Sequence, residues 1–177
     1  MDNLTLIIPA KNEAESLPKV LSELKKYNYK TDIVLHATDI DTIQAIKECK
    51  VNIVYQENFG YGDALIHGIK QCKTKYFCIF NADGSFNPAE ISKIHETLKA
   101  KKLDFIFASR YQASSGSEDD TIITLVGNYI FTYIGKIFFR LNISDILYTF
   151  VIGKTDQANI LDLKQKDFSF CVELPIK

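Results

Sequence analysis

Residues 76–88 read Tyr76-Phe77-Cys78-Ile79-Phe80-Asn81-Ala82-Asp83-Gly84-Ser85-Phe86-Asn87-Pro88. The opening apolar run, rich in aromatic residues, predicts a buried strand. A polar loop with one carboxylate, Asp83, follows it. Asn87 and Pro88 then predict the N-cap and first residue of a helix, with Glu90 at its third position. Open α/β sheets bind ligands at the carboxyl ends of their strands, so Asp83 is a candidate site residue, with an ordinary Asx-turn as the alternative.

Apolar runs on both sides of this segment alternate between strand-like and helix-like spacing. Besides 76–80, strands are predicted at residues 4–8, 32–35, 51–55 and 103–108. Helical spacing follows each of the first four strands. This alternation predicts an α/β fold with a largely parallel sheet and helices on both faces. The 177 residues fit one domain, 1–177, of ordinary size.

Composition limits the binding partners and the cellular compartment that are expected for this chain. A net charge of -1 offers no basic surface, so nucleic acid is not expected as a partner. The four cysteines show no C-x-x-C spacing, which argues against a zinc site or a disulfide framework and favours a reducing compartment. The N-terminus has no basic region and only a short apolar run, so no signal peptide is predicted and the expected location is cytoplasmic.

Three turns at predicted strand ends are candidate nucleotide contacts. A base could rest on the exposed backbone of Pro9 and Ala10, with Glu13 reaching a ribose or base; a helix entry is the alternative for Glu13. Asp39 could accept a hydrogen bond from the nucleotide or cap the next helix. Gly60 and Gly62 could let a backbone approach an anion at a helix N-terminus, or merely make the turn. Gly68, inside a predicted helix, indicates that another element packs close by.

Asp83 and Ser85, which follow Asn81 and Ala82, form the candidate metal site. A carboxylate beside a diphosphate suits Mg²⁺ or Mn²⁺, which takes oxygen ligands and few protein ones. The metal would neutralise charge on the leaving diphosphate. Ser85 could supply a second ligand directly or through water.

These motifs together resemble family 2 glycosyltransferases of the GT-A (Rossmann-like) fold, closest to the dolichyl- or polyprenyl-phosphate mannosyl- or glucosyltransferase branch. The resemblance is carried by residues 7–13, 58–68, 82–88 and 108–111, and further on by Asn128, 145–150 and 168–174. It implies metal-assisted, inverting transfer of a sugar from a GDP- or UDP-linked donor to a lipid-phosphate or saccharide acceptor.

The resemblance also implies roles for individual residues. Asp83 matches the metal-binding aspartate of a D-x-D motif, and Ser85 stands where the branch often has a glutamine ligand. Arg110 matches an arginine near the diphosphate or the acceptor phosphate; a surface arginine is the alternative. A lipid phosphate needs no general base, whereas a hydroxyl acceptor does, and Asp145 is the candidate. The expected nucleotide-binding residues are Pro9, Ala10, Glu13, Asp39, Gly60, Gly62, Asn81 and Ala82.

The sequence departs from the family pattern at several positions. Asn81 replaces the first D-x-D aspartate and brings no charge. The basic pair that usually precedes the next helix would fall near Asp120 and Thr121, which are not basic. The chain stops at Lys177, where relatives carry on. The sequence therefore looks shortened at the C-terminus. Two alternatives stay open: a non-catalytic nucleotide- or membrane-binding relative, and a sugar nucleotidyltransferase-like enzyme, although 9–13 lacks the latter's glycine-rich basic loop.

Residues 121–140 contain two charges, Lys136 and the closing Arg140, among many large apolar side chains. A helix this apolar is either buried or lies in a lipid interface, so we expect a membrane-facing helix and a peripheral location on a membrane. The alternative is that a C-terminal region missing from this sequence normally covers the helix and that self-association into a homodimer hides it here. The preceding polar loop, 114–120, is a candidate lid.

Overall fold

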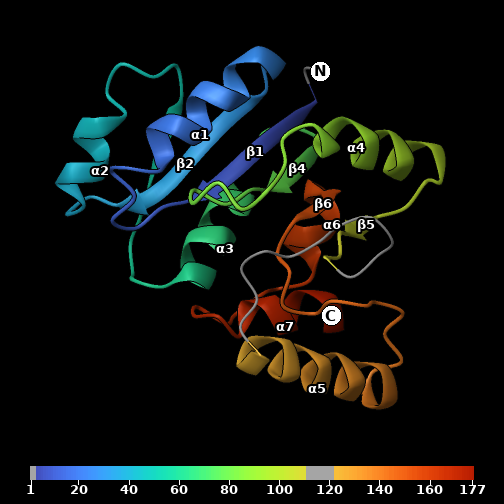
Figure 1. Ribbon diagram of the computed structural model, residues 1–177. Coiled ribbons are helices and arrows are strands. Elements are labelled where there is room, and N and C mark those ends of the chain that lie inside the picture. Colours follow the sequence, from blue (N-terminus) through green and yellow to red (C-terminus); the bar gives the residue numbers. More distant parts are fainter. Residues whose placement is uncertain (1–2, 111–121) are drawn as a thin grey trace.

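The computed structural model describes residues 3–110 and 122–177, in which a six-stranded sheet is covered by helices on both faces (Figure 1). The first half of the chain forms β1 (Leu4–Pro9), α1 (Leu17–Leu24), a 3₁₀ turn (Lys25–Tyr27), β2 (Lys30–His36), α2 (Ile40–Ala45), β3 (Asn52–Gln56), α3 (Tyr61–Gln71), β4 (Tyr76–Ile79) and α4 (Glu90–Ala100). The second half forms β5 (Phe105–Phe107), α5 (Ile122–Phe138), β6 (Val151–Lys154), α6 (Thr155–Ile160) and α7 (Phe170–Ile176). The predicted lid loop, 114–120, lies outside the described residues.

The strands lie in the order β3-β2-β1-β4-β6-β5. Strands β1 to β4 pair in parallel, which confirms the largely parallel sheet. The sequence did not predict β6, which is antiparallel to both β4 and β5 and separates them. Because β6 runs backwards, its first residue, Val151, pairs with Ile79 at the end of β4 and with Phe107 at the end of β5. The chain just before β6 therefore reaches the carboxyl edge of the sheet.

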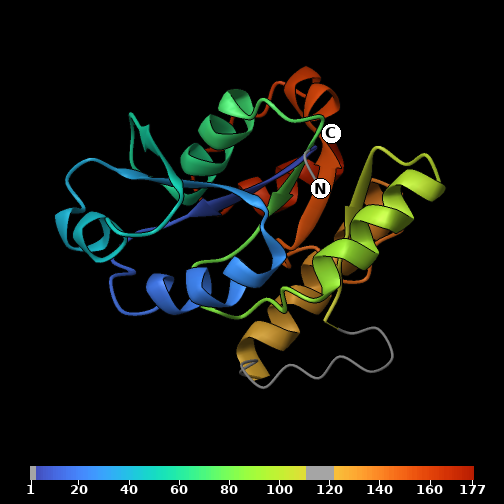
Figure 2. The same ribbon diagram turned by 90° about the horizontal axis from the view of Figure 1, so that it is seen from above.

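Alternating side chains of the strands fill one apolar core on each face. Figures 1 and 2 show α1, α2 and α4 on one side of the strands and α3, α6 and α7 on the other. In β1, Leu4, Leu6 and Ile8 point into the first core, whereas Ile7 points into the second. This is the alternation that a strand buried on both faces requires.

Local signals place some helix starts well and others less well. Pro18 lies in the first turn of α1, where its missing N–H costs little. Asp39 caps α2 by accepting a hydrogen bond from the Thr42 N–H at 3.3 Å. The predicted start of α4 was wrong: Ala89 is its N-cap, and Asn87 accepts a hydrogen bond from the Ala89 N–H in a turn that precedes the helix. The Asx-turn has delayed the helix by two residues.

At Gly68, α3 packs closely against the sheet, as the glycine inside a predicted helix indicated. A Cβ atom there would lie 2.5 Å from Ile7 Cγ2 and 2.9 Å from Val34 Cγ2. Alanine is the better helix former by about 1 kcal/mol. We nevertheless expect Gly68→Ala to lower the free energy of unfolding by about 1–3 kcal/mol, because overpacking outweighs propensity. Urea unfolding measures this, with Gln71→Ala, at the exposed end of the same helix, as the control. A Gly68→Ala variant as stable as the control would contradict the packing.

Helix α5 lies at the margin of the molecule, away from the sheet (Figure 1). Among its described side chains, polar ones are buried and large apolar ones are exposed, the reverse of the usual arrangement. Asn128 and Thr132 are buried, whereas the exposed side chains are Tyr129, Ile130, Phe131, Tyr133, Ile134, Lys136, Ile137 and Phe138. Within the described ranges, no helix combines the length and apolar character needed to cross a bilayer.

Candidate functional site

The carboxyl edge of the sheet gathers the polar segments on which the sequence argument rested. The parallel strands β1 to β4 end there, so the turns that follow them lie side by side. Reversal of β6 adds residues 145–150 to the same edge, and the end of β5 adds Ser109 and Arg110. Segments as distant in sequence as residues 9 and 150 therefore lie at the same edge, as expected of a ligand site in an open α/β sheet.

Asp83 lies exposed in the turn after β4. One carboxylate oxygen accepts a hydrogen bond from the Ser85 N–H at 2.9 Å. This contact forms the Asx-turn that was the structural alternative, and it fixes the direction of the carboxylate. The second oxygen accepts no hydrogen bond from the described residues and is available to a ligand. Asp83 can therefore form the Asx-turn and still offer an oxygen to a ligand.

Asn81 is held by Tyr61, which was not among the candidate residues. The hydroxyl of Tyr61 donates a hydrogen bond to Asn81 Oδ1 at 3.2 Å and pairs with Thr149 Oγ1 at 2.8 Å. Burial raises the pKa of the Tyr61 phenol, so the hydroxyl stays protonated and can donate. Asn81 Nδ2 in turn donates to Ser85 Oγ at 3.4 Å. The amide at the first position of the motif is thus built into a network that includes the segment before β6.

The turns after β1 and β2 are fastened to each other. Asp39 accepts hydrogen bonds from the Asn12 N–H at 2.7 Å and the Thr42 N–H at 3.3 Å, so both of its oxygens are engaged. The Glu13 N–H donates to Thr42 Oγ1 at 2.9 Å, and the Glu13 carboxylate accepts a hydrogen bond from the Ser16 hydroxyl. These contacts confirm the capping role of Asp39. Nucleotide contact by Glu13 and Asp39 stays a prediction.

The predicted exposure of the backbone at Pro9 and Ala10 is wrong, because both residues are buried. The Ala10 N–H is also taken, because it donates to the Val34 carbonyl at 2.9 Å. Continued parallel pairing with β2 explains the burial. Ala82, after β4, is buried as well, at 4% exposure.

Gly60 and Gly62 are needed for a close backbone approach that the sequence did not reveal. A Cβ on Gly60 would lie 2.1 Å from the Lys166 carbonyl oxygen, and one on Gly62 would lie 2.2 Å from that of Gln165. The Lys166 carbonyl accepts a hydrogen bond from the Asp63 N–H at 2.9 Å. The first turn of α3 is therefore covered by residues 165–167. A diphosphate contact by either glycine stays a prediction.

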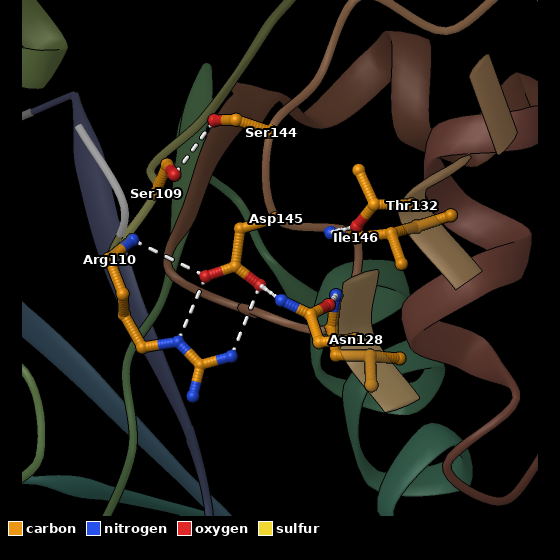
Figure 3. Close-up of polar contacts among 8 residues, drawn as sticks. Ser109, Arg110, Asn128, Thr132, Ser144, Asp145 and Ile146 are labelled. Carbon is orange, nitrogen blue, oxygen red and sulfur yellow. Dashed lines mark hydrogen bonds and ion pairs between the residues drawn. The ribbon is translucent and has the colours of Figure 1, made fainter. Parts of the chain in front are cut away.

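Arg110, which is partly exposed, and Asp145, which is buried, form an ion pair at the same edge (Figure 3). Arg110 donates through Nε to Asp145 Oδ2 at 2.9 Å and through a terminal nitrogen to Oδ1 at 3.1 Å, and its backbone N–H donates to Oδ2 at 3.3 Å. The guanidinium also lies 5.3 Å from the ring centre of Tyr148. Burial, followed by the Glu90 carboxylate, raises the pKa of Tyr148 to about 12 despite the opposing effect of Arg110. Arg110 is thus not a free surface arginine.

The ion pair continues into α5 through polar side chains. Asn128 Nδ2 donates to Asp145 Oδ1 at 2.7 Å, and Asn128 Oδ1 accepts from the Leu147 N–H at 3.3 Å (Figure 3). Thr132 Oγ1 accepts from the Ile146 N–H at 3.2 Å. These hydrogen bonds explain why the polar residues of α5 face inward. Hydrogen bonds to residues 145–147, before β6, therefore fix α5 in place.

A profile of glycosyl transferase family 2 matches residues 5–158. The chain belongs to glycosyl transferase family 2. This match spans β1 to α6 and includes the turns after β1 to β5 and residues 145–150. Among similar proteins, an uncharacterised protein of Methanocaldococcus jannaschii is 28% identical over 138 residues, 75% of this chain and 57% of that protein.

A second relative has a named activity. The UDP-N-acetylglucosamine–dolichyl-phosphate N-acetylglucosaminyltransferase of Methanococcus voltae is 24% identical over 151 residues, 73% of this chain and 60% of that enzyme. The chain thus spans less than two thirds of the length of both relatives.

Solved structures confirm a GT-A fold. Glucosyl-3-phosphoglycerate synthase from Mycobacterium tuberculosis, in complex with Mn²⁺, UDP and glucosyl-3-phosphoglycerate, superposes with a TM-score of 0.75 at 10% identity, over 98% of this chain and 63% of that one. Mannosyl-3-phosphoglycerate synthase from Rubrobacter xylanophilus gives 0.70 at 13% identity, over 88% of this chain and 54% of that one. At these identities the likeness concerns the fold alone.

The donor set at the edge of this family 2 chain suits a divalent ion that arrives with its substrate. Asp83 offers one carboxylate, and Ser85 and Asn81 offer neutral oxygens. Among the described residues there is no group of three or more His, Cys, Asp or Glu side chains able to enclose a metal. One carboxylate plus substrate phosphates is a usual way to hold Mg²⁺.

Proposed function

We propose that this chain transfers a sugar from a nucleotide-sugar to an acceptor with inversion, assisted by Mg²⁺ or Mn²⁺ at Asp83. The observation that carries this proposal is the fixed, exposed carboxylate of Asp83 at the ligand edge of a family 2 fold. In the reaction an acceptor oxygen bonds to the anomeric carbon from the face opposite the nucleotide. The bond from that carbon to the diphosphate breaks, and its electron pair leaves with the diphosphate. When bound, the divalent ion would neutralise charge on this leaving group.

Arg110 is suited to holding an anionic group, either the donor diphosphate or an acceptor phosphate. Its guanidinium is fixed by Asp145 and Tyr148, and its side chain is still 26% exposed. Asp145 itself is fully buried, and both of its oxygens already accept hydrogen bonds. We therefore assign Asp145 to positioning Arg110 rather than to proton transfer. An acceptor that is already anionic, such as a lipid phosphate, requires no base.

A thermal-shift screen tests the donor class directly. UDP-, GDP- and dTDP-sugars are each added with and without Mn²⁺. We expect one nucleotide class to raise the melting temperature in a metal-dependent manner, because a ligand that binds only the folded state stabilises it. No shift with any donor in the presence of the metal would contradict the proposal.

The outward face of α5 supports an acceptor at a membrane surface. Its buried side is held by polar anchors, Asn128 and Thr132, whereas its exposed side carries large apolar residues and one charge, Lys136. Tyr129 and Tyr133 stack on this face with ring centres 6.5 Å apart, and such rings settle at the headgroup level of a bilayer. Lys136 has the length to reach the headgroups. The named activity of the Methanococcus voltae relative is toward dolichyl phosphate, which is the same class of acceptor.

Liposome flotation tests this membrane contact. We expect the wild type to float with liposomes and Phe131→Glu/Phe138→Glu to lose most of the floating fraction, because two charges on the apolar face oppose insertion. Leu103→Glu/Ile160→Glu is the matched control, since both residues are exposed and apolar but lie off α5. A wild type that stays in solution as a discrete dimer, with α5 protected from hydrogen exchange, would show that self-association covers this face instead.

A further inference from the structure

Phe168 presents an exposed aromatic ring beside the candidate site. Its side chain is 75% exposed, although one face of the ring stacks on Tyr61, with ring centres 5.2 Å apart and planes inclined by 16°. The opposite face is therefore open to solvent. Tyr61 in turn donates a hydrogen bond to Asn81, so one tyrosine side chain separates Phe168 from the Asn81–Asp83 loop.

The backbone that carries Phe168 is held at several points. The Glu173 carboxylate accepts hydrogen bonds from the Lys164 N–H at 2.9 Å and the Gln165 N–H at 2.8 Å. The Lys166 carbonyl accepts one from the Asp63 N–H of α3 at 2.9 Å. Immediately after Phe168, the Ser169 N–H donates to the Asp167 carboxylate at 2.8 Å. The backbone around Phe168 is therefore fixed by hydrogen bonds, and the ring is exposed at a defined position.

The position of Phe168 favours the sugar end of a nucleotide-sugar. Under the proposed function the nucleoside lies over the turns after β1 and β2, and the diphosphate lies at Asp83 after β4. Tyr61 contacts Asn81 and Thr149, so Tyr61 and the stacked Phe168 lie at the Asn81 end of that edge, next to the loop that carries Asp83. The sugar is joined to the diphosphate, so this placement brings the sugar toward Phe168.

We propose that the open face of Phe168 packs against the sugar ring of the donor, with Tyr61 as its support. This inference rests on the proposed function. A hexose ring has an apolar face of C–H groups, and its burial on an aromatic ring removes both surfaces from water. The polar edge of the sugar remains free to form hydrogen bonds with other groups. Phe168 would thus select for a sugar on the nucleotide and make no contribution to the nucleoside itself.

Paired titrations test this role. Calorimetry measures the affinity for UDP and UDP-glucose, and in parallel for GDP and GDP-mannose, all with Mn²⁺. We expect Phe168→Ala to weaken nucleotide-sugar binding about 5- to 10-fold, the loss of one aromatic contact, and to leave the affinity for the free diphosphate unchanged. Ile160→Ala is the matched control, because Ile160 is also apolar and is 72% exposed, outside the site.

A second variant separates the contact from any effect on folding. The chain contains no tryptophan, so Phe168→Trp introduces a single indole fluorophore. Its emission should change on addition of the nucleotide-sugar and not on addition of the matching diphosphate, with affinity close to that of the wild type. If Phe168→Ala weakens both ligands equally, or neither, the assignment to the sugar is wrong while the proposed function stands. If no nucleotide binds the wild type, the proposed function and this inference fall together.

Discussion

Replacing Asp83 with alanine should remove the Mn²⁺ dependence of nucleoside-diphosphate binding and weaken the affinity measured with the metal about 100-fold. Asp83 is the single carboxylate of the candidate metal site, and Asn81 and Ser85 offer only neutral oxygens. Without the Asp83 carboxylate, the neutral oxygens of Asn81 and Ser85 would hold a divalent ion only weakly, so the ion would add little to diphosphate binding. Isothermal titration of UDP and GDP, with and without Mn²⁺, measures the effect.

The control for this experiment is Asp156→Ala, which removes an exposed aspartate from α6 at the opposite edge of the sheet. It should leave both affinities unchanged. Asn81→Asp should act in the opposite direction from Asp83→Ala, because it restores a negative charge and tightens metal binding. If Asp83→Ala and Asn81→Asp both titrate like the wild type, Asp83 is not the metal residue.

Removing Asp145 should lower the free energy of unfolding by about 3 kcal/mol, the lower end for a buried pair, because it removes the buried carboxylate that holds the Arg110 guanidinium, whose side chain is 26% exposed. A loss of this size corresponds to a fall of roughly 10 °C in melting temperature for a chain of this length. Asn128 would lose its acceptor at the same time. Urea unfolding of Asp145→Ala measures the effect.

Two further variants identify the cause of that loss. Asp104→Ala removes the exposed partner of Lys154 and should cost less than about 1 kcal/mol, as exposed ion pairs do. Arg110→Met/Asp145→Leu should be more stable than Asp145→Ala alone, since it removes both charges of the pair. An Asp145→Ala variant no less stable than Asp104→Ala would contradict the importance of the pair.

Local patterns in the sequence were sufficient for the first four strands and the helices between them. The alternation of short apolar runs with helical spacing is a property of neighbouring residues, and it placed Asp83 correctly at the carboxyl end of β4. Gly68 is a similar case, because a glycine inside a helix has a cost that indicates close packing.

The contacts that complete the site join residues far apart in the chain, and local patterns do not reveal these. Strand β6 is only four residues long and depends on antiparallel pairing with β4 and β5. Because its reversal was not predicted, Asp145 could not be paired with Arg110, 35 residues earlier. The approach of residues 165–167 to Gly60 and Gly62 spans about a hundred residues, and a glycine pair alone does not say what comes near it. Tyr61, between these glycines, was the local signal that could have been used.

Release of nucleoside diphosphate from nucleotide-sugars tests the central claim most directly. The wild type and Asp83→Ala are incubated with the donor selected by thermal shift, Mn²⁺ and a short-chain polyprenyl phosphate, and the released UDP or GDP is quantified. We predict metal-dependent release by the wild type that is lost in Asp83→Ala. Tight, metal-dependent binding of the donor with no release, with the lipid phosphate or with saccharide acceptors, would contradict the claim and identify the chain as a non-catalytic nucleotide-binding member of family 2.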